Sequence, residues 1–233
     1  MKPAATRSIL LAIYRRLFRL FGPQQWWPGK TSFEVAVGAI LTQNTNWLNA
    51  ARAISCLRKE RSLHPKSLAK LPHRRLGRLI RSSGYFNQKA QRLKIFVSYL
   101  QARYAGDMRR MKRVSLPTLR RELLDLSGIG PETADSILLY ALGKPVFVVD
   151  AYTRRILARH GFIRWEASYA EIQSLFMDRL PIRSGFFNEY HALLVALGKE
   201  LCLKNRPKCH LCPLRNLGRL QLESSVSKSF PVQ

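Results

Sequence analysis

Residues 117 to 155 read PTLRRELLDLSGIGPETADSILLYALGKPVFVVDAYTRR, and this stretch decides the fold. Three leucines share the spacing of one helical face: Leu119, Leu123 and Leu126. The residues Ser127-Gly128-Ile129-Gly130 interrupt that spacing, because glycine accepts the positive φ angles that a sharp turn needs. Pro131 suits the first turn of a second helix, where its missing N–H costs nothing. The stretch therefore predicts two helices joined by a tight glycine turn.

A short apolar run follows the second helix and ends in one acid, Val146-Phe147-Val148-Val149-Asp150. A glycine turn that enters a helix presents backbone N–H groups and the positive end of the helix dipole, which together bind phosphate. Two plainer interpretations stand beside this one. The glycine turn is also typical of an ordinary helix corner, and Asp150 is also typical of a helix N-cap.

The composition favours a folded protein that binds a polyanion. The chain has 233 residues, is 46% hydrophobic, and carries a formal net charge of +26 with a pI near 10.9. Such a balance favours nucleic acid first and an anionic membrane surface second. No apolar run reaches the roughly 18 residues that a membrane span requires. We therefore expect a protein that contacts double-stranded DNA and has no membrane partner.

The hairpin and the acid together resemble the helix-hairpin-helix DNA glycosylases of the endonuclease III superfamily. That family carries Leu-x-Gly-hydrophobic-Gly, then Thr-Ala, then Val-Asp. The matching residues are Leu126, Gly128, Ile129, Gly130, Thr133, Ala134, Val149 and Asp150. The resemblance implies that Gly128, Ile129, Gly130 and Thr133 form a phosphate-binding hairpin. It also implies that Asp150 is the catalytic carboxylate beside the sugar of an extruded nucleotide.

The resemblance further implies an all-α fold of two lobes, with the DNA cleft between them. One lobe would be a six-helix unit over residues 29–143 that ends in the hairpin. The other would combine residues 1–28 with residues 144–223, and residues 224–233 would be a disordered tail. Val146 to Val149 is the only run with strand character.

Three segments resemble the 3-methyladenine glycosylase branch of the superfamily. Trp26 and Trp27 lie in a loop, and Trp47 follows a strongly apolar helix at residues 33–41. The branch uses aromatics here to sandwich an alkylated base, whose positive charge suits indole faces. Lys199 matches a pocket-side lysine of that branch. Simple packing of the tryptophans explains the pattern equally well.

Two further segments predict residues that enter the base stack. The resemblance makes Gln43 and Asn44 both candidates for a plug that fills the gap left by the extruded nucleotide. Tyr85 matches the position of a wedge residue in the segment Gly84-Tyr85-Phe86-Asn87-Gln88-Lys89. The alternatives are a polar helix end at residues 43–44 and a core aromatic at residue 85.

The family's bifunctional members carry a nucleophilic lysine in the second hairpin helix, and the matching residue here is Glu132. A carboxylate cannot form the Schiff base that lyase chemistry needs. We therefore expect a monofunctional glycosylase that releases an alkylated purine such as 3-methyladenine. The alternatives are an endonuclease III-like glycosylase and lyase acting on oxidised pyrimidines, and a non-catalytic helix-hairpin-helix module that grips DNA.

Cysteines near the C-terminus match most of a cluster motif. Cys202-x6-Cys209-x2-Cys212 has the spacing of the first three ligands of the family's [4Fe–4S] cluster, whereas the fourth position holds Gly218. Such clusters normally need four thiolates. Three interpretations stay open: a cluster with another fourth ligand, a loop without metal, and a zinc site that uses His210. The fourth cysteine of the chain, Cys56, is expected in the core.

The N-terminal residues 8–21 are amphipathic and contain arginines but no acid. We interpret them as a first structural helix that buries Ile9, Ile13, Leu17 and Leu20, although a mitochondrial targeting peptide has the same composition. No secretory signal is evident, and the cysteines suit a reducing compartment. We expect a monomer in the cytoplasm or nucleoid that binds double-stranded DNA containing damaged bases.

Overall fold

The computed structural model describes residues 3–27 and 29–217, and these residues fold entirely as helices and connecting loops. Among them no β-strand occurs, so the apolar run before Asp150 lies in a connecting segment without strand partners. No helix in the described part of the chain is both long enough and apolar enough to cross a membrane. The all-α prediction is confirmed.

The chain divides into two compact units. The first unit contains Met1–Gln24, Val149–Pro181 and Glu189–Gln233, and the second contains Gln25–Val148 and Ile182–Asn188. The expected lobes had boundaries near residues 28 and 143, and they assigned residues 182–188 to the other lobe. The expected tail, 224–233, lies outside the described residues.

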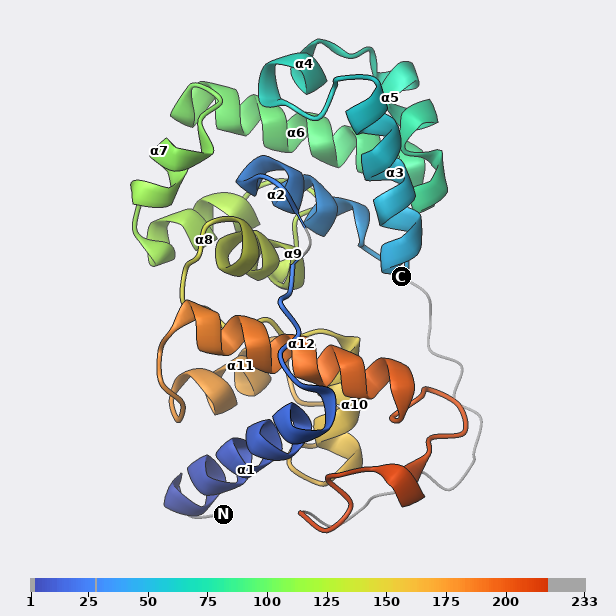
Figure 1. Cartoon of the computed structure of the whole chain (residues 1–233). Coiled ribbons are helices and arrows are strands. Elements are labelled where there is room, and N and C mark those ends of the chain that lie inside the picture. Colours follow the sequence, from blue (N-terminus) through green and yellow to red (C-terminus); the bar gives the residue numbers. More distant parts are fainter. Residues whose placement is uncertain (1–2, 28, 218–233) are drawn as a thin grey trace. The chain divides into compact units, whose positions relative to one another are not determined.

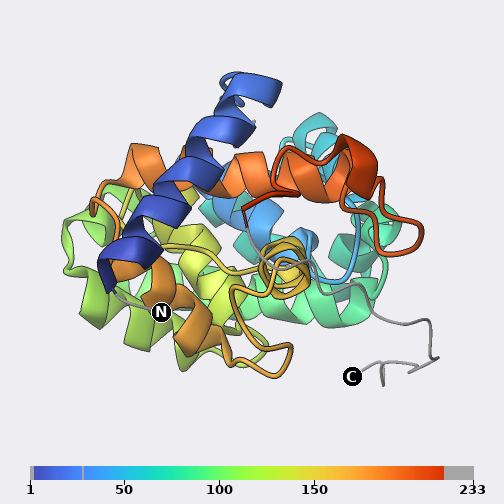
Figure 2. The same ribbon diagram turned by 90° about the horizontal axis from the view of Figure 1, so that it is seen from below.

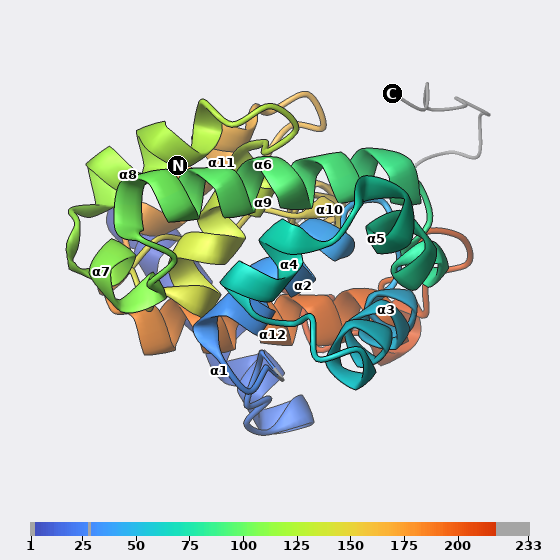
Figure 3. The same ribbon diagram turned by 90° about the horizontal axis from the view of Figure 1, so that it is seen from above.

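The second unit is built around a buried helix (Figures 1 and 3). Its helices are α2 (Ser32–Leu41), α3 (Trp47–Lys59), α4 (Pro65–Lys70), α5 (His73–Leu79), η1 (Arg81–Ser83), α6 (Phe86–Tyr104), α7 (Met108–Arg113), α8 (Leu116–Leu124), α9 (Pro131–Ser136), the π-helical turn η2 (Ile137–Ala141) and the start of α12 (Ser184–Glu200). All of α2 from Phe33 to Leu41 is buried, because it packs against α3, α6 and η2. The longest helix of this unit, α6, also lies against α4 and α5.

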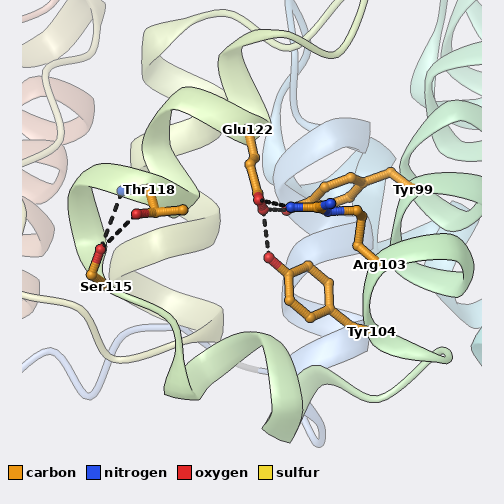
Figure 4. A network of polar contacts seen from close by, with 6 residues as sticks. All are labelled: Tyr99, Arg103, Tyr104, Ser115, Thr118 and Glu122. Carbon is orange, nitrogen blue, oxygen red and sulfur yellow. Dashed lines mark hydrogen bonds and ion pairs between the residues drawn. The ribbon is translucent and has the colours of Figure 1, made fainter.

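A carboxylate between two helices fastens α8 to α6. Glu122 accepts hydrogen bonds from the hydroxyls of Tyr99 and Tyr104, at 2.7 and 2.5 Å, and from Nη2 of Arg103 at 2.8 Å (Figure 4). Ser115 caps the start of α8 by accepting from the N–H of Thr118. The helix that leads into the glycine turn therefore has a defined position.

The two helices of the hairpin are joined by a buried ion pair. Asp135 on α9 is fully buried, and it accepts from Nε and Nη2 of Arg120 on α8 at 2.8 and 3.1 Å. A bidentate pair of this kind fixes the angle between two helices as well as their distance.

The first unit contains α1 (Pro3–Phe21), α10 (Ala151–Arg159), α11 (Tyr169–Met177), the longer part of α12 and the short helix η3 (Cys209–Leu211). Figure 2 shows α1 crossing α12, and the hydroxyl of buried Tyr190 on α12 donates to the carbonyl of Leu10 at 2.7 Å. Ile13 and Leu17 are buried as expected, whereas Ile9 is half-buried and Leu20 is exposed.

Some local predictions were wrong. The spacing of apolar residues favours two helices over residues 48–80 and one further helix over residues 91–104. The structure instead has three helices over residues 48–80, and α6 begins at Phe86. Cys56 is exposed, because the buried face of α3 runs along Ala50, Ala53, Ile54 and Leu57 and leaves residue 56 outside it.

Candidate functional site

The glycine turn between α8 and α9 has the geometry that the sequence predicts. Gly128 has a φ of +82°, which a residue with a side chain rarely adopts, and a Cβ there would also meet Arg92 at 2.6 Å. Gly130 is the N-cap of α9 and has no side chain to accept from the first N–H groups of that helix. Ile129 is buried and anchors the turn through its side chain.

Gln43 is tied to this turn. Its Nε2 donates to the carbonyl of Gly128 at 3.0 Å and to Oγ1 of Thr133 at 2.8 Å, and its Oε1 accepts from Nη1 of Arg92 at 2.5 Å. Thr133 is itself buried, so its hydroxyl supports Gln43. The contacts make Gln43 a brace between the end of α2 and the hairpin.

Two other candidates for entry into the base stack are exposed. Asn44 is exposed and has a φ of +51°, and Tyr85 is exposed over 56% of its surface with a φ of +43°. Left-handed backbone at residues other than glycine is uncommon and clusters where function requires a particular orientation. The alternative of a core aromatic at residue 85 does not agree with its exposure.

A buried lysine connects the two exposed segments. Nζ of Lys89 donates to the carbonyl of Leu41, the last residue of α2, at 2.9 Å and to that of Ser83 at 2.5 Å. Burial first, and then the neighbouring Arg92, lower the pKa of Lys89 to about 8. One side chain thus fixes the backbone just before Gln43 and Asn44 and the backbone just before Tyr85.

The three tryptophans lie together in the second unit. Ring centroids are 5.6 Å apart for Trp26 and Trp27, 6.2 Å for Trp26 and Trp47, and 5.2 Å for Trp27 and Trp47. Tyr140, which the sequence did not single out, adds a fourth ring 5.0 Å from Trp27. Gly38 allows this approach, because a Cβ there would lie 3.3 Å from Nε1 of Trp27.

Lys199 belongs to the first unit, where it is exposed near the end of α12, and the tryptophans belong to the second. Its place beside the base pocket stays a prediction.

Asp150 stands at the start of α10 and does cap that helix. Its Oδ1 accepts from the N–H of Thr153 at 2.7 Å, and its Oδ2 lies 3.5 Å from Nε2 of His191 on α12. The side chain keeps 12% of its surface exposed, so one edge of the carboxylate is accessible. Capping and chemistry are compatible here, because the cap uses only one of the two oxygens.

The surroundings keep Asp150 ionised. Burial alone would raise the pKa of this carboxyl, but the His191 imidazole and the Thr153 N–H outweigh that effect and hold the pKa below its ordinary value. His191 is a contact that sequence reasoning missed, because it lies 41 residues further along the chain in another helix, with no local pattern to mark it.

The cysteine loop is held by arginines from two helices. Arg155 and Arg159 of α10 donate to the carbonyls of Gly198, Cys202, Leu203 and Lys204. Arg16 of α1 donates to the carbonyl of Pro213 at 3.0 Å. Cys202 and Cys212 are buried in this loop, and Cys209 is half-buried. Gly218 lies outside the described residues.

The cysteine sulfurs do not converge on one point. Within residues 3–27 and 29–217, no three side chains of histidine, cysteine, aspartate or glutamate are placed to hold a single metal ion. His210 is exposed. The arrangement therefore does not fit a zinc ion that uses His210. Cys202, Cys209 and Cys212 line one small recess together with His160, and the described part of the chain supplies no fourth thiolate there.

An all-α chain with a glycine-cornered helix hairpin, a carboxylate that caps the next helix and a cluster of indoles belongs to the class of helix-hairpin-helix DNA repair proteins. The family model of the HhH-GPD superfamily base excision DNA repair proteins matches residues 37–181. This chain belongs to that family, and is a base excision DNA glycosylase that binds DNA.

Individual relatives agree with this assignment. A protein of Methanocaldococcus jannaschii, whose name provisionally assigns it to the DNA repair glycosylases, is 44% identical over 89% of this chain and 94% of its own length. The H. pylori 3-methyladenine DNA glycosylase bound to 1,N6-ethenoadenine has a TM-score of 0.70 at 28% identity, covering 84% of this chain and 97% of that one. A non-covalent endonuclease III–DNA complex has a TM-score of 0.76 at 25% identity, covering 94% and 96%.

Proposed function

We propose that this chain is a monofunctional DNA glycosylase that releases alkylated purines such as 3-methyladenine from duplex DNA and leaves an abasic site. The observation that carries the choice of substrate is the cluster of Trp26, Trp27, Trp47 and Tyr140. Electron-rich ring faces attract a cationic base, and indole does so best. A cationic purine also has a weakened glycosidic bond. Stacking therefore selects a base that is already a good leaving group.

The proposed chemistry centres on Asp150. As the base departs, positive charge develops on the sugar, and a nearby carboxylate stabilises that charge or takes a proton from the attacking water. His191 and the N–H of Thr153 keep Asp150 in the ionised form that both roles need. Asn44 and Tyr85 fill the gap in the duplex, and the N–H groups of Gly128 and Gly130 hold a phosphate.

The absence of lyase activity is proposed from Glu132. It lies in the first turn of α9, where the negative charge suits the positive end of the helix dipole. This residue supplies no amine to attack the sugar, so the reaction ends with base release.

The test measures base release from four matched duplexes that contain 3-methyladenine, thymine glycol, an abasic site or no lesion. The wild-type chain is compared with Asp150→Asn and with the control Asp178→Asn, an exposed aspartate of the same unit. We expect release from the 3-methyladenine duplex alone, lost in Asp150→Asn and retained in Asp178→Asn.

Each rival function gives a different result. Release from thymine glycol together with borohydride trapping on the abasic duplex would indicate a bifunctional enzyme for oxidised pyrimidines. Tight binding to all four duplexes with no release from any of them would indicate a non-catalytic binding module. Full activity in Asp150→Asn would exclude the carboxylate from the reaction.

A further inference from the structure

One face of α10 packs against the cysteine loop, residues 202–213. Tyr152, Arg155 and Arg159 are spaced three and four positions apart, so they lie on the same side of the helix. The Tyr152 ring is so close to Gly198 that a Cβ at residue 198 would lie 2.3 Å from Cδ1 of the ring. The guanidinium of Arg155 lies over that ring, with Cζ 5.0 Å from the centroid. The helix therefore presents an aromatic ring and two cations to the chain that enters the loop.

Each of these arginines donates two hydrogen bonds to the backbone. The four carbonyls lie where α12 ends and the loop begins, at distances of 2.6 to 3.0 Å from the guanidinium nitrogens: Gly198, Cys202, Leu203 and Lys204. At the other end of the loop, Nη1 of Arg16 donates to the carbonyl of Pro213 at 3.0 Å. Hydrogen bonds from a charged donor are roughly twice as strong as neutral ones. Protein groups thus hold both ends of the loop.

The recess inside the loop does not fit the cluster that the cysteine spacing resembles. The recess lined by Cys202, Cys209 and Cys212 has a volume of about 10 Å³, which is at the lower limit for a single water molecule. His160 lines the same recess, and its Nε2 lies 3.7 Å from Sγ of Cys212. A [4Fe–4S] cluster needs space for its irons and sulfides as well as four thiolates, and the described part of the loop has three cysteines.

The buried cysteines instead pack as small apolar side chains. Cys202 and Cys212 are buried, as is common for a free cysteine, and Leu214 just beyond them is fully buried. The backbone of the loop also bonds to itself. The N–H of Lys208 donates to the carbonyl of Leu201 at 2.9 Å, and the N–H of Cys212 donates to that of Cys209 at 3.2 Å. The loop therefore has a packed interior and its own hydrogen bonds.

We propose that the cysteine loop folds without a metal, and that the guanidinium groups of Arg155 and Arg159 do the structural work that a cluster would otherwise do. The stability of the loop then depends on arginine and not on iron. Because α10 begins directly after Asp150, one helix would position both the loop and the proposed catalytic carboxylate. This inference does not depend on the substrate or the reaction proposed above.

The first part of the test measures metal. The full chain is purified under anaerobic conditions, and its iron and sulfide are assayed before and after incubation with ferrous iron and sulfide. Visible absorption near 400 nm is recorded on the same samples. We expect neither iron nor sulfide to be bound in stoichiometric amounts in either state.

The second part measures how fast the loop cysteines are alkylated, with mass spectrometry to identify each site. Wild type, with and without an iron chelator, is compared with Arg159→Met, Cys209→Ser and the control Arg154→Met. Arg154 is on the same helix, but it donates to the carbonyls of Trp165 and Ala167, outside the loop. Circular dichroism and thermal melting check that each variant folds.

We expect slow alkylation of Cys202 and Cys212 in wild type, at the same rate with and without chelator. Arg159→Met frees two loop carbonyls, so the loop opens more often and alkylation of Cys202 becomes at least about tenfold faster. Arg154→Met should leave that rate near wild type. Cys209→Ser should keep both the rate and the melting temperature near wild type, because it removes no metal ligand.

Four results would overturn the proposal. Stoichiometric iron and sulfide in the wild-type chain, or alkylation that the chelator accelerates, would show that a metal holds the loop. A fall in melting temperature for Cys209→Ser as large as that for Arg159→Met would give the structural role to the thiolates. Equal alkylation of Cys202 in folded Arg159→Met and in Arg154→Met would remove the role of the arginine. If Arg159→Met does not fold, the iron assay and Cys209→Ser still decide between a loop with metal and one without.

Discussion

Asp150 has two oxygens with separate tasks. Oδ1 caps α10 through Thr153, and Oδ2 faces His191. Because its pKa in the folded chain lies below the ordinary value, the ionised group stabilises the fold above its unfolded pKa. That stabilisation is lost as the pH falls through the folded pKa. We therefore expect His191 to act as a positioning residue that sets the acid limit of activity.

His191→Gln tests this role. Removing the imidazole removes a group that favours the charged carboxylate, so the pKa of Asp150 rises and the acid limb of the base-release rate moves to higher pH. Single-turnover rates between acidic and neutral pH measure the shift, with His210→Gln as the control. An unchanged acid limb in a folded His191→Gln protein would show that His191 does not influence the reacting carboxylate.

Tyr85 presents its ring on left-handed backbone at 56% exposure, which is costly unless the ring has a use. If the ring replaces roughly 1 to 3 kcal/mol of base stacking, Tyr85→Ala lowers the single-turnover rate about 5- to 150-fold. Tyr85→Phe keeps the stacking surface and should remain near wild type. Thermal melting should change little in either variant, so equal rates for all three proteins would remove the wedge role.

Residue roles that depend on local sequence could be predicted, and those that depend on distant contacts could not. Asp150 follows an apolar run and opens a helix, so its position at a helix N-terminus could be predicted from the sequence. Gln43 and Asn44 could not be ordered, because the bonds that make Gln43 a brace go to residues 85 and 90 positions away. His160 joins the cysteines from 42 residues upstream of Cys202, which no spacing rule covers.

At the scale of elements, Lys89 connects α6 to both exposed segments of the proposed DNA contact. Lys89→Met leaves the carbonyls of Leu41 and Ser83 unpartnered, and each costs about 1 to 3 kcal/mol. We expect a lower melting temperature and a loss of excision larger than that of Tyr85→Ala, because both segments shift.

Lys94→Met is the matched control for this change. Lys94 is on the same helix, and its Nζ also donates to two carbonyls, those of Leu68 and Ala69, remote from the proposed contact. Equal losses of excision in the two variants would show that Lys89 supports stability alone.

The hairpin depends on the ion pair between Arg120 and Asp135. Asp135→Asn removes the charge and keeps the shape. We expect the free energy of unfolding to fall by about 2 to 3 kcal/mol. This is less than the usual cost of breaking a buried ion pair, because Arg120 is partly exposed and is hydrated once the pair is broken. Glu60→Gln breaks the exposed pair with Arg75 and should cost less than about 1 kcal/mol. Urea denaturation measures both, and similar costs for the two variants would contradict the role of the buried pair.

The hairpin helices could be predicted because their signals are local, namely leucines at helical spacing, a glycine turn and a proline start. The π-helical turn at Ile137–Ala141 could not, since one uniformly apolar stretch suits either helix type. The division of residues 48–80 into three helices was also missed, because His64 and Pro72 cap short helices within one apparently continuous pattern.

At the scale of the whole molecule, the dominant property is the net charge of +26. Phosphate contacts release condensed counterions, so that log K falls linearly with log salt concentration and the slope counts those contacts. A base pocket made of uncharged rings adds affinity that does not depend on salt. We therefore expect added salt to lower the affinity for every duplex and to leave the preference for a lesion unchanged.

Binding of lesion-containing and undamaged duplexes, measured by fluorescence anisotropy with Asp150→Asn to prevent turnover, tests this separation. If about six basic side chains contact phosphates, both duplexes give a slope of about −5, and affinity falls roughly 10³-fold between 50 and 200 mM salt. The lesion duplex binds more tightly by the same factor at each salt concentration, because stacking releases no counterions. A slope near zero would show that the positive charge serves another purpose. A lesion preference that vanished with added salt would show that charge, and not the indole cluster, selects the base.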